Sequence, residues 1–279
     1  MGTRGVRRAT LAREVTLAGH AVRTHGGAVA LRLAPGDEGL VFVRDDTGAR
    51  YRAALEQVVP VPNCTALGAD GAPAVLFVEH VLSALVGLDY TDAEIHVDGA
   101  EVPLLDGSAL PLVTALADVG RTPLDGELAP LSPTEPVVVG DGARSLALLP
   151  ADAWSADYTL VHPHPLIGED RLALNALDSY ATAIAPARTF ATVEELAALR
   201  DAGLLKGGSE ADLLVVHPDR LSSPLRLAHE FAAHKLLDLI GDLALVGAPV
   251  VGCLVARRTG HADNQALARA LRAATGWSG

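Results

Sequence analysis

Apolar runs and apolar–polar alternation recur in both halves of the chain and predict β-strands there. In the first half these patterns cover Ala28 to Leu33 and Leu40 to Arg44. In the second half they cover Val137 to Val139, Ser145 to Leu149 and Tyr158 to His162. Helical patterns come after the strands in each half. We therefore expect an α+β architecture in which one order of elements is repeated.

Apolar residues at helical spacing predict one helix in the first half and three in the second. In the first half, the spacing of Val81, Leu85 and Leu88 favours a helix that ends near Gly87. In the second half, helices are predicted over Thr192 to Asp201, Leu225 to Val246 and Asp263 to Ala273. The second of these has Pro224 near its start and Gly247 just after its end, as helix boundaries often do.

A proline-rich segment separates the two halves. Residues 122–136 contain four prolines, which remove backbone donors and disfavour helix. Their composition is typical of a linker. The interpretation is an N-terminal α+β domain over 1–121, a linker over 122–136 and a C-terminal α+β domain over 137–279.

Composition excludes several classes of protein. The chain of 279 residues is 49% hydrophobic, enough to build one large or two medium cores. Its formal charge of −12 argues against a nucleic-acid partner, because phosphate contacts need clustered cations. Cys64 and Cys253 are far apart and suit a reducing compartment.

The sequence also bears on where the protein acts. No apolar run approaches the roughly 20 residues of a membrane span, and the basic start MGTRGVRRATLAREV has no apolar core of the signal-peptide kind. We expect a cytoplasmic protein without stable membrane insertion.

Three side chains that can bind metal lie four residues apart in the stretch HEFAAHKLLDLIGDLALVG. They are His234, Asp238 and Asp242, and on a helix this spacing places them on one face. Neutral imidazole and carboxylate are both good zinc donors, so His234 and Asp238 are candidate ligands. A single pair of this kind also occurs as a satisfied core or surface pair, and that alternative stays open here.

The third ligand is expected from Glu79 and His80, which stand at the head of the first-half helix. Adjacent helical side chains diverge by about 100°, so His80 can bind metal while Glu79 faces the water to be activated as a general base. The simpler alternative is that both residues interact with the helix dipole. A site of two histidines and one aspartate, with an open fourth position, suits hydrolysis assisted by one Zn²⁺ per chain, with Fe²⁺ as the alternative ion in the cell.

Further polar residues fit a hydrolase. His261 precedes a helical segment, and Asp242 could orient it as an imidazolium. Thr189 offers a hydroxyl donor, and Lys235 offers a cation for a phosphate or for a developing oxyanion.

Seven sequence blocks stand in order along the chain. They are Val78-Glu-His-Val-Leu-Ser-Ala-Leu-Val-Gly-Leu88, Glu101-Val-Pro-Leu-Leu-Asp-Gly-Ser-Ala109, His164-Pro-Leu-Ile-Gly168, Ala187-Arg-Thr-Phe190, Lys206-Gly-Gly-Ser209, His234-Lys-Leu-Leu-Asp-Leu-Ile-Gly-Asp-Leu243 and Gly260-His261. Together they resemble the LpxC family of zinc-dependent UDP-3-O-acyl-N-acetylglucosamine deacetylases of lipid A synthesis. The resemblance runs from about Arg8 to Leu271.

The resemblance implies a role for each matching residue. The implied zinc ligands are His80, His234 and Asp238, and the implied general base is Glu79. It further implies catalytic or substrate-binding roles for a second group of residues: His261 as the charge-stabilising histidine, Asp242 as its partner, Thr189, Lys235 near the substrate's phosphates, Phe190, His25 and Thr24.

The resemblance also implies two domains of similar topology, with helical layers packed face to face. Each domain is expected to carry an insert, and the second insert is expected to form a hydrophobic passage for the substrate's acyl chain. The chain departs from the family pattern around this passage. Thr24 replaces a leucine, Ala191-Thr192 replaces Gly-Phe, Ala211 begins the pair that replaces Asp-Asn, and Ala233 replaces an arginine.

Three functions stay open at this point. The first is deacetylation of UDP-3-O-acyl-N-acetylglucosamine, and the second is the same zinc chemistry on a different N-acyl sugar or related amide. The third is a metal-retaining binding or regulatory protein without turnover. For either enzyme the expected partner is a small-molecule sugar substrate, and the expected state is a monomer.

Overall fold

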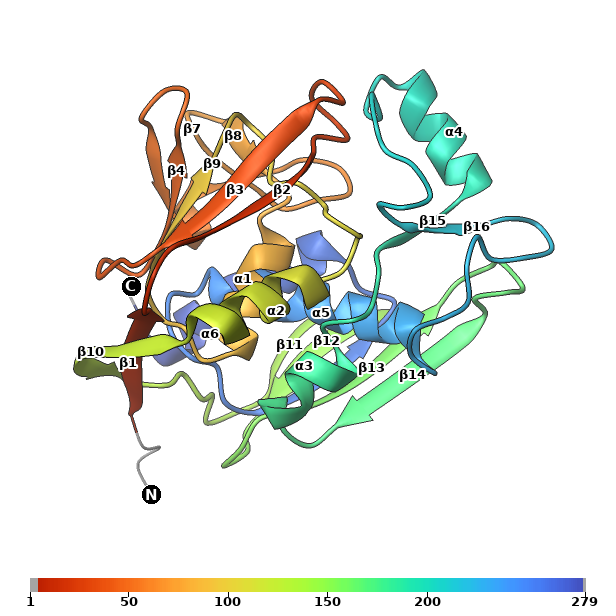
Figure 1. Cartoon of the computed structure of the whole chain (residues 1–279). Helices are drawn as coiled ribbons and strands as arrows, with labels where there is room; N and C mark the ends of the chain where they lie inside the picture. Colours follow the sequence, from red (N-terminus) through yellow and green to blue (C-terminus); the bar gives the residue numbers. More distant parts are fainter. Residues whose placement is uncertain (1–4, 278–279) are drawn as a thin grey trace.

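The computed structural model describes residues 5–277, in which two five-stranded sheets enclose a layer of helices (Figure 1). The first sheet takes all its strands from the first half of the chain. In spatial order they are β2 (Val15–His20), β3 (Ala28–Ala34), β9 (Ala93–Val97), β4 (Leu40–Arg44) and β5 (Arg50–Arg52).

The second sheet takes its strands from the second half and repeats the topology of the first. In spatial order they are β11 (Val137–Asp141), β12 (Arg144–Leu149), β17 (Cys253–Arg257), β13 (Ser155–Val161) and β14 (Glu169–Leu174). In both sheets the central strand pairs antiparallel on one side and parallel on the other, and the remaining neighbours are antiparallel. The predicted α+β class is confirmed, and the repeated order of elements is seen.

Four helices fill the space between the sheets, two from each half. They are α1 (Glu79–Gly87), α2 (Leu110–Val119), α5 (Glu230–Ala244) and α6 (His261–Thr275). The main helical contact between the halves is made by α1 and α5. These two helices approach closely at Gly241, where an added Cβ would lie 2.0 Å from the Glu79 carbonyl oxygen. Only glycine allows this crossing, which sets the first turn of α1 against α5.

Each half carries extra elements, which lie between β5 and α1 in the first half and between β14 and α5 in the second. In the first half these are a 3₁₀ turn η1 (Leu55–Gln57) and a three-stranded sheet of β6 (Val58–Val59), β7 (Ala66–Ala69) and β8 (Ala72–Leu76). In the second half they are η2 (Leu177–Ser179), α3 (Tyr180–Ala183), β15 (Phe190–Thr192), α4 (Val193–Asp201) and β16 (Leu214–Val216). Figure 1 shows α4, β15 and β16 projecting beyond the end of the second sheet.

The proline-rich segment is more ordered than the predicted linker. Its first part forms β10 (Arg121–Leu128), which pairs antiparallel with β1 (Val6–Leu11). Pro123 is tolerated because this ribbon has only two strands and its register shifts beside Ala9, the partner of Pro123. The first part of the predicted linker over 122–136 therefore forms a strand, and the division into domains at this segment stays a prediction.

The boundaries of two predicted helices also change. The helix expected from Leu225 begins only at Glu230, because the Glu230 side chain accepts a hydrogen bond from the Arg226 backbone and holds the preceding residues in a turn. The helix expected from Asp263 begins at His261 and ends at Thr275. Within residues 5–277, no helix combines the length and apolar character that crossing a bilayer requires.

Candidate metal centre and active site

His80, His234 and Asp238 direct one ligand atom each toward a common point. Asp238 Oδ1 lies 3.6 Å from His80 Nε2 and 3.5 Å from His234 Nε2. All three side chains are buried, and their ligand atoms lie within 4.8 Å of one another. Two imidazole nitrogens and one carboxylate oxygen form a donor set that fits a zinc-type divalent ion with an open coordination position. His80 comes from α1 and the other two from α5, so both halves contribute.

The surroundings of His234 prepare it to bind metal. Its Nδ1 lies 3.2 Å from the Ala187 carbonyl oxygen, which makes Nδ1 the protonated nitrogen and leaves Nε2 with a free lone pair. Burial lowers the pKa of His234 to about 3, although the Asp238 carboxylate opposes this shift. A neutral imidazole is the form that binds a metal ion. By contrast, His80 Nδ1 is buried without a hydrogen-bond partner in the described part of the chain.

A buried ion pair holds the segment that orients His234. Arg188 donates through Nε to Glu230 Oε1 at 2.7 Å, and its backbone N–H donates to the same oxygen. Arg188 also donates to the Pro224 carbonyl oxygen. Since Arg188 follows Ala187 directly, these bonds hold the carbonyl that faces His234. Neither Arg188 nor Glu230 was proposed as a site residue from the sequence, and a lone acidic residue 42 positions away gave no signal of this pairing.

Glu79 is a buried carboxylate beside the candidate ligands. Its side chain is 3% exposed, and its Oε2 accepts a hydrogen bond of 3.0 Å from the Thr65 backbone N–H. Burial raises the pKa of Glu79 above its ordinary value, although His261 and His80 act in the opposite direction. A carboxylate whose pKa is raised is a stronger base than an ordinary one, which suits a general base.

His261 and Asp242 form a charged pair on the far side of Glu79. His261 Nδ1 lies 2.8 Å from Asp242 Oδ2, and His261 Nε2 lies 3.9 Å from Glu79 Oε1. Burial alone would lower the pKa of His261, but Asp242, Glu79 and Asp238 together raise it to about 10. The imidazole is therefore positively charged at neutral pH. His261 is the first residue of α6, and Asp242 lies one turn beyond Asp238 on α5.

Lys235 and Phe190 lie against the same group of residues. Lys235 Nζ donates to Asp238 Oδ2 at 2.9 Å and lies 5.6 Å from the centre of the Phe190 ring. The Phe190 ring in turn packs edge-on against the rings of Phe231 and His234. The structure thus places the Lys235 cation on a candidate ligand, and its predicted contact with substrate phosphates stays a prediction.

Thr189 is held by its backbone between the two halves. Its N–H donates to the Gly107 carbonyl oxygen of the first half, and its carbonyl oxygen accepts from the Leu214 N–H of β16. Within residues 5–277 the Thr189 hydroxyl makes no side-chain hydrogen bond, so it is free to donate to another group. It lies two residues from the carbonyl that orients His234.

Thr24 and His25 lie in a loop that Glu101 organises. Glu101 accepts hydrogen bonds from the backbone N–H groups of Val22 and Thr24 and from the Thr24 hydroxyl. His25 is exposed, and its Nδ1 accepts from the Gly27 N–H. The sequence block beginning at Glu101 was recognised, but this function of Glu101 was not predicted.

The segment Lys206-Gly-Gly-Ser209 packs on this loop. Both Lys206 and Gly207 donate backbone hydrogen bonds to the Val22 carbonyl oxygen. A Cβ at Gly207 would lie 2.6 Å from the Cα of Gly26, so the two backbones can approach only because glycine stands there. The segment therefore joins the second insert to the first half of the chain.

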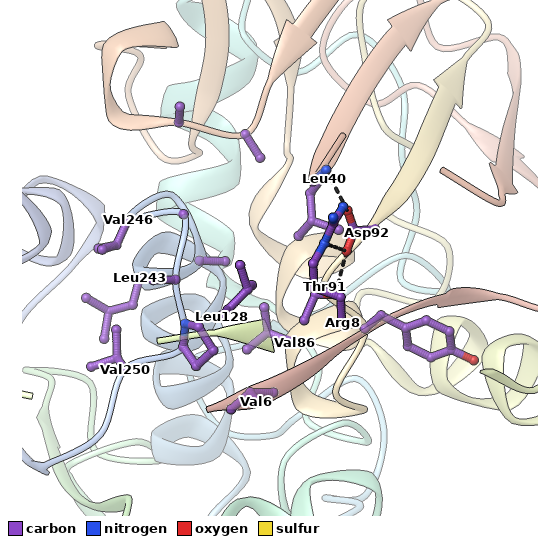
Figure 2. Close-up of a pocket in the computed structure, with 18 of the residues that line it drawn as sticks. Val6, Arg8, Leu40, Val86, Thr91, Asp92, Leu128, Leu243, Val246 and Val250 are labelled. Carbon is purple, nitrogen blue, oxygen red and sulfur yellow. Dashed lines mark hydrogen bonds and ion pairs between the residues drawn. The ribbon is translucent and has the colours of Figure 1, made fainter. Parts of the chain in front are cut away.

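A cavity of about 660 Å³ opens at the other end of α1, away from the candidate ligands. Figure 2 shows its apolar wall and the ion pair between Arg8 and Asp92 on its other side. The apolar wall includes Val6, Val86, Leu128, Leu243, Val246 and Val250. None of the predicted site residues lines this cavity, and the buried Asp92 carboxylate on its wall is paired with Arg8. The chemistry thus points to the metal cluster and not to the cavity.

The structure adds three residues to the network around Asp242. The Thr65 hydroxyl donates to Asp242 Oδ1, and Asn264 Nδ2 donates to Asp242 Oδ2 at 2.8 Å. Gln265 Nε2 donates to the Thr65 hydroxyl at 3.2 Å. The positions of Asn264 and Gln265, three and four residues after His261, place them on the same side of a helix as His261 and could have suggested their involvement. The sequence around Thr65 carries no comparable signal.

Comparisons with known proteins agree with the geometry. A model of the LpxC family, described as UDP-3-O-acyl N-acetylglycosamine deacetylase, matches residues 8–273. The chain belongs to the LpxC family. The resemblance predicted from the sequence is thereby confirmed, and the chain is a member of a family of amide-hydrolysing enzymes.

Similar proteins of the same family extend over most of the chain. A UDP-3-O-acyl-N-acetylglucosamine deacetylase from Anaeromyxobacter dehalogenans is 40% identical over 266 residues, which are 93% of this chain and 85% of the relative. Relatives with the same name from Phenylobacterium zucineum and Leptospira biflexa are 39% and 35% identical, over 90% and 95% of this chain and 89% and 90% of the relatives.

Proposed function

We propose that this protein is a zinc-dependent deacetylase that removes the acetyl group from the 2-amino group of UDP-3-O-acyl-N-acetylglucosamine, a step of lipid A biosynthesis. The observation that carries the proposal is the convergence of His80, His234 and Asp238 beside the buried carboxylate of Glu79. A carboxylate this close to two of the candidate ligands supports a role for Glu79 as the base in a hydrolysis reaction. The substrate is inferred from the relatives, which are named as UDP-3-O-acyl-N-acetylglucosamine deacetylases.

Each residue has a role in the proposed reaction. His80, His234 and Asp238 would hold the zinc ion, which when bound would supply a Lewis acid for the amide carbonyl and lower the pKa of water. Glu79 removes a proton from the attacking water, whose oxygen bonds to the acetyl carbon. The carbon–nitrogen bond then breaks, the nitrogen takes the proton held by Glu79 and leaves as an amine, and acetate is released.

His261 and Thr189 are proposed to stabilise the charge that develops during this reaction. His261 is charged because Asp242 holds it in that state, and its Nε2 faces Glu79. A positively charged donor beside the reacting carbonyl stabilises the transition state more than the neutral substrate. The Thr189 hydroxyl and the Lys235 cation are proposed as further donors to the oxyanion or to the substrate's phosphates.

The departures from the family pattern favour a second candidate, the same chemistry on a different N-acyl sugar. Thr24 bonds its hydroxyl to Glu101, so a polar side chain stands where the family has a leucine. Ala191 and Thr192 lie in β15 and at the start of α4, where the family has Gly-Phe. Smaller or more polar residues at these places would suit a shorter acyl chain. Phe190, Thr24 and His25 remain the proposed substrate contacts.

One experiment separates these candidates. The zinc-loaded protein is incubated with UDP-3-O-acyl-N-acetylglucosamine of several acyl lengths and with simpler N-acetyl sugars, and released acetate is measured, with Glu79→Gln as the matched control. Acetate from the UDP-linked substrate alone supports the first function, and acetate from simple sugars supports the second. Zinc binding without acetate from any of them would overturn both and leave a binding protein.

We further propose that the protein acts in the cytoplasm, since both of its cysteines are free and suit a reducing compartment, and that it is a monomer. Light scattering coupled to gel filtration tests the monomer. A mass of twice 28.8 kDa would contradict it.

A further inference from the structure

We propose that Thr65 is a positioning residue that ties the general base Glu79 to the Asp242–His261 pair. The inference rests on the proposed function, because it concerns how the groups of that site are held. Thr65 is fully buried at the approach to β7, in the first insert, and none of the roles assigned so far includes it.

The backbone of Thr65 holds one of the two groups. Its N–H donates a hydrogen bond of 3.0 Å to Glu79 Oε2, so one carboxylate oxygen of Glu79 is restrained. The other oxygen, Oε1, is the one that lies near His261 Nε2. Since Glu79 is buried, a donor to only one of its oxygens orients the carboxylate and leaves the second oxygen for the reaction.

The side chain of Thr65 holds the second group. A hydroxyl has one proton to donate and two lone pairs that can accept. The Thr65 hydroxyl donates to Asp242 Oδ1, accepts from Gln265 Nε2 at 3.2 Å, and lies 3.3 Å from His261 Nδ1. The hydroxyl thus gives its one proton to Asp242 and accepts from Gln265, and His261 Nδ1, whose closer partner is Asp242 Oδ2, lies beside it. Asp242 is correspondingly satisfied on both oxygens, because Oδ2 accepts from His261 and Asn264.

Together these contacts close a ring of four residues. Thr65 connects to Glu79 through its backbone and to Asp242 through its hydroxyl, Asp242 connects to His261, and His261 Nε2 faces Glu79. The residues come from the first insert, α1, α5 and α6. Thr65 is the member of the ring that bonds both to Glu79 of the first half and to Asp242 of the second half. Its hydroxyl therefore sets the distance and angle between these two groups.

The test compares variants that remove or keep the hydroxyl while keeping the backbone N–H. Thr65→Val removes it with nearly the same shape, and Thr65→Ser keeps it. Thr10→Val is the matched control, because Thr10 is also a buried threonine whose hydroxyl accepts a hydrogen bond, from Gly36 N–H, in β1. We expect Thr65→Val to lower kcat by about 10- to 100-fold, the usual range for residues that orient reacting groups.

Four further results are expected if Thr65 acts by positioning. The KM and the bound zinc of Thr65→Val stay near those of the wild type, Thr65→Ser recovers most of the lost kcat, and Thr10→Val keeps full kcat. In the double variant Thr65→Val with Asp242→Asn, kcat falls by clearly less than the product of the two single effects, because both changes break one network. An unchanged kcat in Thr65→Val, or fully multiplicative effects, would overturn the inference.

Two additional measurements keep the test decisive. If Thr65→Val melts well below Thr10→Val, Thr65→Ala replaces it, because alanine removes the hydroxyl without leaving a methyl group against Asp242. The imidazole nitrogen and proton resonances of His261 are recorded in each variant, and we expect Thr65→Val to shift the Nδ1 resonances. This readout needs no substrate. A wild type that releases no acetate refutes the proposed function alone, whereas unshifted His261 resonances refute the role of Thr65.

Discussion

The two halves of the chain share one sheet topology but contribute different chemistry. The core helix of the first half, α1, brings Glu79 and His80, whereas its counterpart α5 brings His234, Asp238 and Asp242. The second core helices differ more. α6 begins with His261, which carries a positive charge, while α2 begins with Leu110, an apolar residue. The repeated fold places the starts of these helices at equivalent points, but the side chains at those starts differ between the halves.

The inserts show a second difference between the halves. The first insert packs into the molecule and places Thr65 against Glu79 and Asp242. The second projects outward, and α4 buries only Leu196. The first insert is thus part of the support for the reacting groups. The second insert reaches the same region through Phe190, whose ring packs edge-on against that of His234.

The largest expected effect comes from removing a ligand from either half. His80→Ala and His234→Ala should both lose bound zinc and lower kcat/KM by about a thousandfold or more, since a metal ion contributes several kcal/mol to transition-state stabilisation and each 1.36 kcal/mol is about tenfold. Metal analysis of the purified variants measures this. If His80→Ala kept a full equivalent of zinc, the second half alone would hold the metal. This result would contradict a metal site shared between the two halves.

The next effect distinguishes the base from the ligands. Glu79→Gln keeps the size and burial of the side chain but cannot accept a proton, so it should retain zinc and lower kcat by about 10²- to 10⁴-fold. Metal content and acetate release are measured on the same preparation. Turnover near that of the wild type would show that the first half does not supply the base.

A pH profile tests the charged pair of the second half. Glu79 must be ionised, so kcat/KM should fall as pH drops through its raised pKa. His261 must be protonated, and its pKa is raised to about 10, so its contribution is present below that pH and lost above it.

Asp242→Asn removes a negative neighbour of His261 and lowers this pKa. The alkaline limb should then move to lower pH, and kcat should fall by about 10- to 100-fold. An unchanged alkaline limb would contradict the prediction that Asp242 raises the pKa of His261.

The smallest expected effect concerns how the halves dock. Gly241→Ala places a Cβ 2.0 Å from the Glu79 carbonyl oxygen, which forces α1 and α5 apart. The free energy of unfolding should fall by about 1–3 kcal/mol, the usual cost of overpacking. Gly142→Ala is the control, because a Cβ there meets no atom within 4 Å, and it should change stability by less than about 0.5 kcal/mol. Equal urea midpoints for the two variants would contradict the close crossing.

Apolar periodicity and alternation along the chain predicted those elements that neighbouring residues determine. The strand over Leu40 to Arg44 and the helix ending at Gly87 lie where alternation and periodicity indicated. The start of α5 did not, because Glu230 is held by Arg188, a residue far away in the chain. The sequence similarly predicted a linker where β10 lies, because this strand forms only by pairing with β1.

The candidate site divides in a similar way. His234 and Asp238 are visible from their spacing on one helix, and Glu79 and His80 from their position at a helix start. Thr65 could not be found from the sequence, because its contacts depend on a backbone N–H and on helices that only the folded chain brings together.

The distribution of the ligands along the chain has a consequence for protein synthesis. β1 pairs with β10, so the first half can close on itself while the second half is still being translated. At that stage His80 and Glu79 are present, but His234, Asp238 and His261 are not. With the roles proposed above, a ribosome-bound first half would neither retain zinc at this site nor hydrolyse the substrate. Activity would begin only when α5 docks against α1.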